Sequence, residues 1–121
     1  MTRYTADHEW IRLEGDTATV GISEHAQQAL GDITFIELPP VGKTIKQGDT
    51  LGVVESVKAA SDIFAPAGGT VATVNTALDA APETINAAAE SDGWICTLAG
   101  VDAAELESLM TPEQYADFCK A

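Results

Sequence analysis

The sequence predicts an all-β fold, a sandwich or barrel with peripheral helices. Short apolar stretches follow one another at close intervals, and Gly, Pro and Asp separate them, which is typical of a domain with many short strands. Several stretches alternate polar and apolar residues with a period of two, as half-buried strands do. Helical spacing is confined to a short segment after Ser23 and to the C-terminal end.

The length of 121 residues indicates one domain, large enough to bury a core without disulfides. Its net charge of −13 excludes binding to nucleic acid or to an anionic membrane surface, because both need clustered Lys and Arg. The sequence contains neither a run of about 18 apolar residues, as a membrane span requires, nor a visible secretory signal. Two cysteines without a disulfide framework fit a reducing cytoplasm. Because no targeting segment is visible, we expect a cytoplasmic, bacterial protein.

The first predicted elements are an antiparallel hairpin and a short helix. Residues 9–13 and 17–22 alternate on either side of a Gly-containing turn, which indicates the hairpin. Ser23 is suited to cap the helix that follows, and Gly31 is suited to end it. The apolar stripe of this helix consists of Ala26, Ala29 and Leu30.

The rest of the chain supplies short strands and then two helices. Residues 75–92, rich in Ala and polar residues, are expected to form a loop. A helix is expected at 102–110, and Thr111 should cap a second one in which Tyr115 and Phe118 face inward. The expected strands are 33–38, 44–46, 50–57, 63–65, 70–74 and 93–98.

Lys58 differs from the other lysines in its neighbours. It lies between the strands expected at 50–57 and 63–65, so it should occupy the tip of a tight hairpin. The residues within two positions of it are small or β-branched and neutral, so none of them offers its amine an ion-pair partner. Local chemistry leaves two interpretations open, a solvated surface lysine and a lysine presented for modification.

The stretch Val-Glu-Ser-Val-Lys-Ala-Ala-Ser-Asp at 54–62 resembles the lipoylation motif of the glycine cleavage system H-protein family. A biotin carrier would present Met-Lys-Met instead, and a lipoyl domain of a 2-oxoacid dehydrogenase would more often present Asp-Lys-Ala in a shorter chain. The resemblance implies a barrel-sandwich hybrid, a single lipoyl-carrier domain over 1–121 with its core at about 17–100. It extends from Tyr4 to Phe118 and includes His8-Glu9-Trp10, residues 18–23, Leu30-Gly31-Asp32, Glu37-Leu38-Pro39, Val41-Gly42, Pro66 and Gly93-Trp94.

The resemblance also implies a non-enzymatic, monomeric carrier with lipoate amide-linked to Lys58. Its partners would be a lipoate-attaching enzyme and three enzymes of glycine cleavage. The pyridoxal-phosphate-dependent glycine decarboxylase would load an aminomethyl group onto the arm, and the aminomethyltransferase would pass the methylene unit to tetrahydrofolate. Dihydrolipoyl dehydrogenase, with FAD and NAD, would reoxidise the dithiol.

Four charged or titratable side chains gain roles from this resemblance. Glu55 would help the lipoylating enzyme to recognise the site, and Asp62 would lie near the parked arm. His8 and Glu9 would line the cleft that shelters the loaded amine. Plainer interpretations stay open, namely solubilising carboxylates for Glu55 and Asp62 and an exposed strand end for Glu9. We expect His25 to be solvated and Cys96 to be a buried structural thiol.

One segment departs from the family, and one alternative function stays open. Many relatives carry a Pro-Tyr-containing segment where this chain has residues 86–92, so the shape of the nearby loop is not predicted. An H-like protein that relays lipoyl groups to other lipoyl-dependent complexes would share the Lys58 motif. An enzyme is disfavoured, because no catalytic-triad, Cys-His, metal-ligand or phosphate-loop spacing is present.

Overall fold

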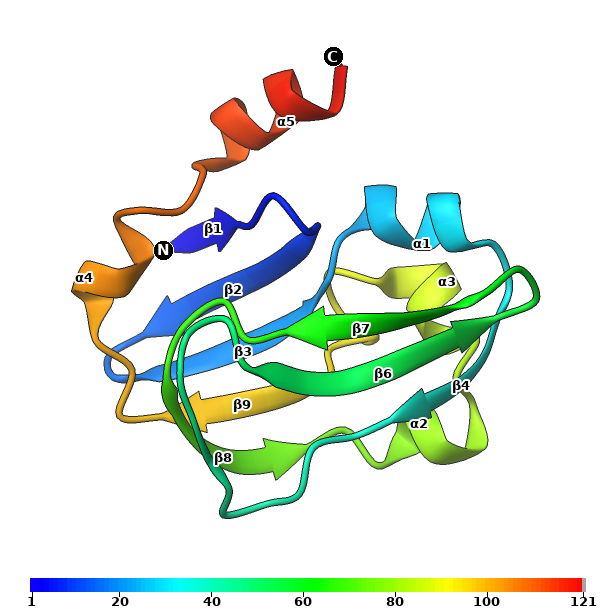
Figure 1. Ribbon diagram of the computed structural model, residues 1–121, viewed down its shortest axis with the longest axis horizontal. Helices are drawn as coiled ribbons and strands as arrows, with labels where there is room; N and C mark the ends of the chain where they lie inside the picture. Colours follow the sequence, from blue (N-terminus) through cyan, green and yellow to red (C-terminus); the bar gives the residue numbers. More distant parts are fainter. Residues whose placement is uncertain (121) are drawn as a thin grey trace.

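The computed structural model describes residues 1–120, which form two antiparallel sheets with short helices around them (Figure 1). The larger sheet has the strand order β1-β2-β3-β9-β8-β5, and the smaller one has the order β4-β6-β7. This arrangement confirms the predicted barrel-sandwich fold with peripheral helices. The strands are β1 (Thr2–Tyr4), β2 (Glu9–Glu14), β3 (Thr17–Ile22), β4 (Ile33–Glu37), β5 (Thr44–Ile45), β6 (Thr50–Ser56), β7 (Ala60–Phe64), β8 (Gly69–Val74) and β9 (Cys96–Ala99).

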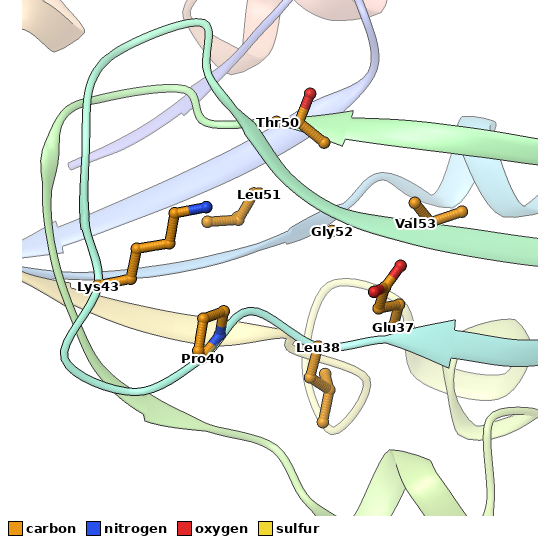
Figure 2. Close-up of a pocket in the computed structure, with 8 residues that line it drawn as sticks. All are labelled: Glu37, Leu38, Pro40, Lys43, Thr50, Leu51, Gly52 and Val53. Carbon is orange, nitrogen blue, oxygen red and sulfur yellow. The ribbon is translucent and has the colours of Figure 1, made fainter.

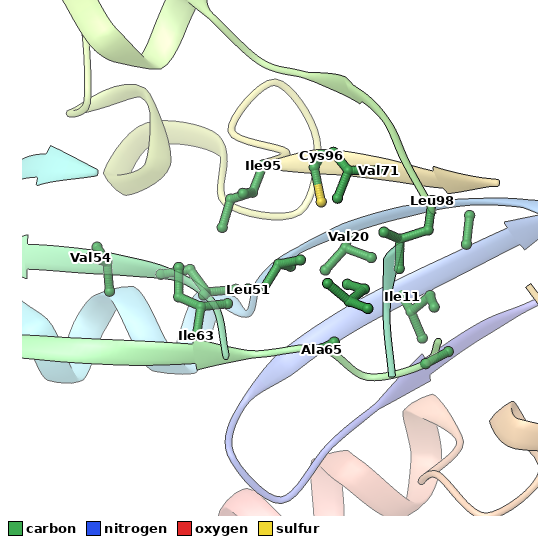
Figure 3. Close-up of a cluster of buried hydrophobic side chains, with 14 of the residues drawn as sticks. Ile11, Val20, Leu51, Val54, Ile63, Ala65, Val71, Ile95, Cys96 and Leu98 are labelled. Atoms are coloured by element: carbon green, nitrogen blue, oxygen red, sulfur yellow. The ribbon is translucent and has the colours of Figure 1, made fainter. Parts of the chain in front are cut away.

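One hydrophobic core fills the space between the sheets (Figure 3). Val54 and Ile63 come from the smaller sheet, and Val20 and Leu98 come from the larger one. The hydrophobic core also includes buried apolar side chains from β2, from the segment before α4 (Ala103–Leu106) and from α4 itself. These additional members are Ile11, Leu13, Val101 and Leu106.

The predicted N-terminal hairpin and helix are both present. β2 and β3 pair in register from Glu9↔Ile22 to Glu14↔Thr17. The side chain of Ser23 accepts a hydrogen bond from the Ala26 amide and so caps α1 (Glu24–Leu30). Gly31 ends the helix with a φ of 79°, a conformation that favours glycine.

Residues 75–92 are not the loop that the sequence predicted. They contain α2 (Ala77–Ala80) and α3 (Thr84–Ala88), which bury Leu78 and Ile85 respectively. Asn86 of α3 accepts a hydrogen bond from the Ile33 amide (2.9 Å) and donates one to the Gly31 carbonyl (2.9 Å). Two very short helices of ordinary composition are thus stabilised by tertiary contacts, which a local pattern does not report.

The chain ends in α4 (Ala103–Leu106) and α5 (Pro112–Lys120), and α5 lies beyond the edge strand β1 (Figure 1). Tyr115 is buried and stacks on Tyr4 with 4.3 Å between the ring centroids. The prediction that Phe118 faces inward is wrong, since its side chain is 42% exposed. This short helix buries Tyr115 alone. Among the helices of the described residues, none is long and apolar enough to cross a membrane.

Candidate functional site

Lys58 lies exposed at the tip of the β6–β7 hairpin, as the sequence predicted. The strands pair as far as Glu55↔Ala60, and the Ser56 amide donates to the Ala59 carbonyl (2.9 Å), which leaves a two-residue loop. The Ser56 hydroxyl accepts hydrogen bonds from the amides of Lys58 (3.2 Å) and Ala59 (3.3 Å). A serine side chain that bonds nearby backbone amides fixes a turn, so the backbone that carries Lys58 is held in place.

A second anchor joins this tip to the end of α1. The Val57 amide donates to the Asp32 carbonyl (3.0 Å), although the Val57 side chain is 67% exposed. A Cβ placed on Gly31 would lie 3.5 Å from Cε of Lys58, so the stem of the lysine passes over this glycine. The lysine therefore has a fixed base and an exposed amine.

Glu55 and Asp62 are both exposed, on β6 and β7 respectively. They are not cross-strand partners, since Glu55 pairs with Ala60 and Asp62 pairs with Val53. The structure therefore places one carboxylate next to the tip and the other further along β7.

Glu9 is buried, with 2% of its surface exposed, which rules out the exposed strand end considered above. Its carboxylate accepts hydrogen bonds from the Thr5 hydroxyl (2.5 Å) and from the Phe64 amide at the end of β7 (3.3 Å). Burial raises the pKa of this carboxyl group, while the two hydrogen bonds oppose the shift.

His8 lies next to Glu9, but its side chain has different partners. Its φ is 70°, which is uncommon for a residue other than glycine. The ring stacks on His25 (4.6 Å between centroids), and its Nδ1 lies 2.6 Å from the Tyr115 hydroxyl. Burial, with a smaller effect from His25, lowers the pKa of His8. His25 is exposed as expected, yet it is in contact with this ring.

The expected cleft residues do not form a single cluster: Asp62 lies on β7 and Glu9 bonds the last residue of β7, whereas the ring of His8 contacts His25 and Tyr115. β7 begins two residues after Lys58 and ends at Phe64, whose amide bonds Glu9. Asp62 lies on the same strand, two residues before Phe64. At about 3.3 Å per residue, β7 spans roughly 13 Å from Ala60 to Phe64.

A separate hollow lies at the other end of β6 (Figure 2). Glu37, Pro40, Lys43 and Thr50 are among the residues that line it, and none of its lining residues was predicted as a site residue. Since β6 runs from Thr50 to Ser56, the hollow and Lys58 are on opposite ends of that strand.

Sequence reasoning missed the residues that position the site. Ser56 was noted as a small neighbour of Lys58 and not as the side chain that fixes the turn. A Ser two residues before the hairpin tip is a local signal that could have been used. Tyr115 was expected to face inward, but its contact with His8, 107 residues away in sequence, has no local signal.

The chain matches the family model described as glycine cleavage H-protein over residues 2–121. It is 52% identical over 116 residues to a glycine cleavage system H protein of Phenylobacterium zucineum, with 96% of each chain covered. A protein of the same description from Beijerinckia indica is 52% identical over 120 residues, covering 99% of this chain and 97% of the relative. The fold is similar to the crystal structure of a glycine cleavage system H protein from Mycobacterium marinum, with a TM-score of 0.88, 39% identity, and coverage of 99% and 97% of the two chains.

Proposed function

This chain belongs to the glycine cleavage H-protein family, and from this premise we propose that it carries a lipoyl group amide-linked to Lys58. The observation that carries the proposal is the exposed lysine on a hairpin tip held by Ser56 and Asp32. A carrier arm needs an anchor that does not move, because the attachment point sets the volume that the arm searches.

The residues at the tip fit such a group. The Lys58 side chain is exposed, and its neighbours within the loop are small or β-branched, so the cleft of a modifying enzyme can enclose the amine. Acylation removes one positive charge and changes the formal balance from −13 to −14. We assign recognition by the lipoate-attaching enzyme to Glu55, which is exposed on β6 within three residues of Lys58.

The lipoyl dithiolane would supply the carrier chemistry: it would accept an aminomethyl group at glycine decarboxylase, give the methylene unit to tetrahydrofolate at the aminomethyltransferase, and be reoxidised at dihydrolipoyl dehydrogenase. The contribution of this chain is to hold, present and protect the arm. It does so as a monomer and as a non-catalytic partner of these enzymes.

Glu9 is the residue that we assign to protection of the loaded amine. An ammonium group away from water needs an anionic acceptor, because burying a charge without a partner is costly. β7 ends at Phe64, whose amide bonds the Glu9 carboxylate, and Asp62 lies on that strand. Each oxygen of the Glu9 carboxylate accepts one hydrogen bond and keeps a further acceptor site, so the group can also accept from an ammonium. His8 would close the same end of the cleft from its neighbouring position.

Mass mapping after co-expression with a lipoate ligase tests the attachment site. We expect the mass increase on the peptide that contains Lys58, and no increase in a Lys58→Arg variant. Lys46→Arg is the matched control and should be modified like the parent chain. Lipoate on Lys43, Lys46 or Lys120 in place of Lys58 would refute the assignment.

Exchange of labelled bicarbonate into glycine, catalysed by purified glycine decarboxylase, tests the carrier role. The lipoylated chain should support this exchange, and Lys58→Arg should not. A chain that donates its lipoyl group to other lipoyl domains but fails in the exchange would instead be the relay protein.

The protective role of Glu9 has its own test. The arm is loaded enzymatically, the decarboxylase is removed, and ammonia release is followed over time. Glu9→Ala removes one charge-assisted hydrogen bond, which is worth roughly 1.5–3 kcal/mol. Ammonia release should therefore be about tenfold to a hundredfold faster in this variant. The lower end is expected because water can share the site. Equal decay rates would rule out Glu9 as the protecting group.

A further inference from the structure

Three metal-ligating side chains meet at the N-terminal end of α1, on the opposite end of that helix from Gly31 and the Lys58 tip. His8 precedes β2, His25 is in the first turn of α1, and Cys119 is near the end of α5. One ligand atom from each residue can be chosen so that all three lie within 4.8 Å of one another. We propose that these three side chains bind a divalent transition-metal ion of the zinc class.

The donor set selects the class of ion. Imidazole nitrogens and a thiolate suit zinc and similar borderline or soft cations, whereas magnesium and calcium need oxygen ligands. Two imidazoles and one thiolate leave the fourth position of a tetrahedral ion for water. The net charge of −13 attracts every kind of cation, so it does not select zinc over the others. The selection comes from the nitrogen and sulfur ligands.

The spacing is close to what the ion requires. With Zn–N of about 2.0–2.1 Å and Zn–S of about 2.3 Å, the ligand atoms of a tetrahedral site lie roughly 3.3–3.6 Å apart. The observed limit of 4.8 Å therefore calls for closure by about an ångström. His25 is exposed and Cys119 is partly exposed near the chain end, so rotation of these two side chains can supply that closure.

The hydrogen bonding of His8 also fits a ligand. Its Nδ1 lies 2.6 Å from the Tyr115 hydroxyl, which lies 2.6 Å from the Ser23 hydroxyl. A histidine that binds a metal usually donates its other ring N–H to a fixed oxygen, and this contact orients the ring. With Nδ1 engaged in this way, Nε2 of His8 is the nitrogen left to bind the ion. The backbone of His8 is in the left-handed region, with a φ of 70°, and this conformation fixes where the side chain leaves the turn before β2.

The test uses the full-length chain carrying Lys58→Arg, with any affinity tag removed, so that neither a lipoyl dithiol nor a tag can bind the metal. Titration with Zn²⁺ by calorimetry should give one ion per chain with a dissociation constant in the micromolar range or below. Titration with Co²⁺ should give the thiolate-to-cobalt charge-transfer absorption. Cys96 is fully buried among apolar side chains, so this absorption reports on Cys119.

Three variants locate the site. Cys119→Ser should abolish the charge-transfer absorption, and both Cys119→Ser and His25→Gln should weaken zinc binding by at least tenfold. Tyr115→Phe, which removes only the hydroxyl that orients His8, should weaken it by about 10- to 100-fold. Gln28→Ala, another exposed position of α1, is the control and should bind zinc like the parent chain.

Thermal unfolding without metal confirms that each variant is folded before it is titrated. Zinc should raise the melting temperature of the parent chain and not that of Cys119→Ser, because an ion that binds only the folded state stabilises it. The proposal is overturned if zinc does not bind, if Cys119→Ser and His25→Gln bind it as tightly as the parent chain, or if excess Mg²⁺ displaces it, which would indicate a site among surface carboxylates.

Discussion

The tip of the β6–β7 hairpin and the region where β2 begins are built in opposite ways. At the tip, Lys58 is exposed, and the backbone of the loop is fixed by Ser56, which bonds the Lys58 amide, and by Asp32, which bonds the Val57 amide. At the start of β2, Glu9 is buried with both carboxylate oxygens bonded, and the ring of His8 contacts Tyr115. In the first region the lysine side chain is exposed to solvent. In the second, polar side chains join segments that are far apart in the sequence. Substitutions should therefore separate function from stability at the tip and couple them at β2.

The largest loss of stability is expected from Gly21→Ala, at the packing beneath β2. A Cβ at this position would lie 2.7 Å from Nε1 of Trp10, a ring that is buried and donates to the Ala89 carbonyl (3.0 Å). Because the indole cannot move without losing this bond, we expect a destabilisation of about 3 kcal/mol in denaturant unfolding. Thr17→Ala, at an exposed position of the same strand, is the control. A loss below about 1 kcal/mol would show that the β2–β3 packing is looser than the structure indicates.

A smaller loss is expected from Asn86→Ala, which tests whether the segment 75–92 holds the base of the arm. The amide of Asn86 accepts from Ile33 N and donates to the Gly31 carbonyl and to the Gln27 side chain (2.9 Å each). At about 1 kcal/mol per hydrogen bond, we expect a loss of roughly 2–3 kcal/mol. Asn86→Asp keeps only the acceptor and should be destabilised by this substitution as well. An unchanged unfolding midpoint for Asn86→Ala would mean that α3 does not support the end of α1.

At the tip the expected change in stability is close to zero. Lys58→Arg replaces an exposed side chain in a loop, so its free energy of unfolding should stay within about 0.5 kcal/mol of that of the parent chain. The same variant should lose lipoylation completely, because a guanidinium does not form the amide. Denaturant unfolding and intact mass measured on one preparation provide both readouts. A large loss of stability would show that the lysine stem over Gly31 contributes to packing, and would break the contrast between the two regions.

The two regions also differ in how far the sequence predicts them. The Lys58 hairpin follows from local patterns, since two strand-forming stretches lie close together on either side of the lysine. The helices α2 and α3 do not, because four- and five-residue helices lack a repeating apolar stripe and are held by contacts such as Asn86 with Ile33. The burial of Glu9 depends on Phe64, 55 residues away, and the orientation of His8 depends on Tyr115. Sequence patterns therefore identify the exposed lysine at the hairpin tip but not the groups packed around Glu9 at the far end of β7.

The last expected effect is a pH dependence of stability at Glu9. Burial raises the pKa of this carboxyl in the folded state above its value in the unfolded chain. Between these two pKa values the folded state binds more protons than the unfolded state, so the contribution of Glu9 to stability falls as pH rises through this window. Glu9→Gln cannot titrate. The stability of the parent chain relative to Glu9→Gln should therefore increase as the pH is lowered from 7 towards the ordinary carboxyl range.

Unfolding curves at several pH values, with a chelator present to exclude metal at His8, measure this difference. Glu55→Gln is the control for removing a carboxylate at an exposed position. A relative stability of the parent chain that instead decreases on acidification would mean that the hydrogen bonds from Thr5 and Phe64 outweigh the burial of the charge. In that case Glu9 would be poised as a carboxylate before any amine arrives.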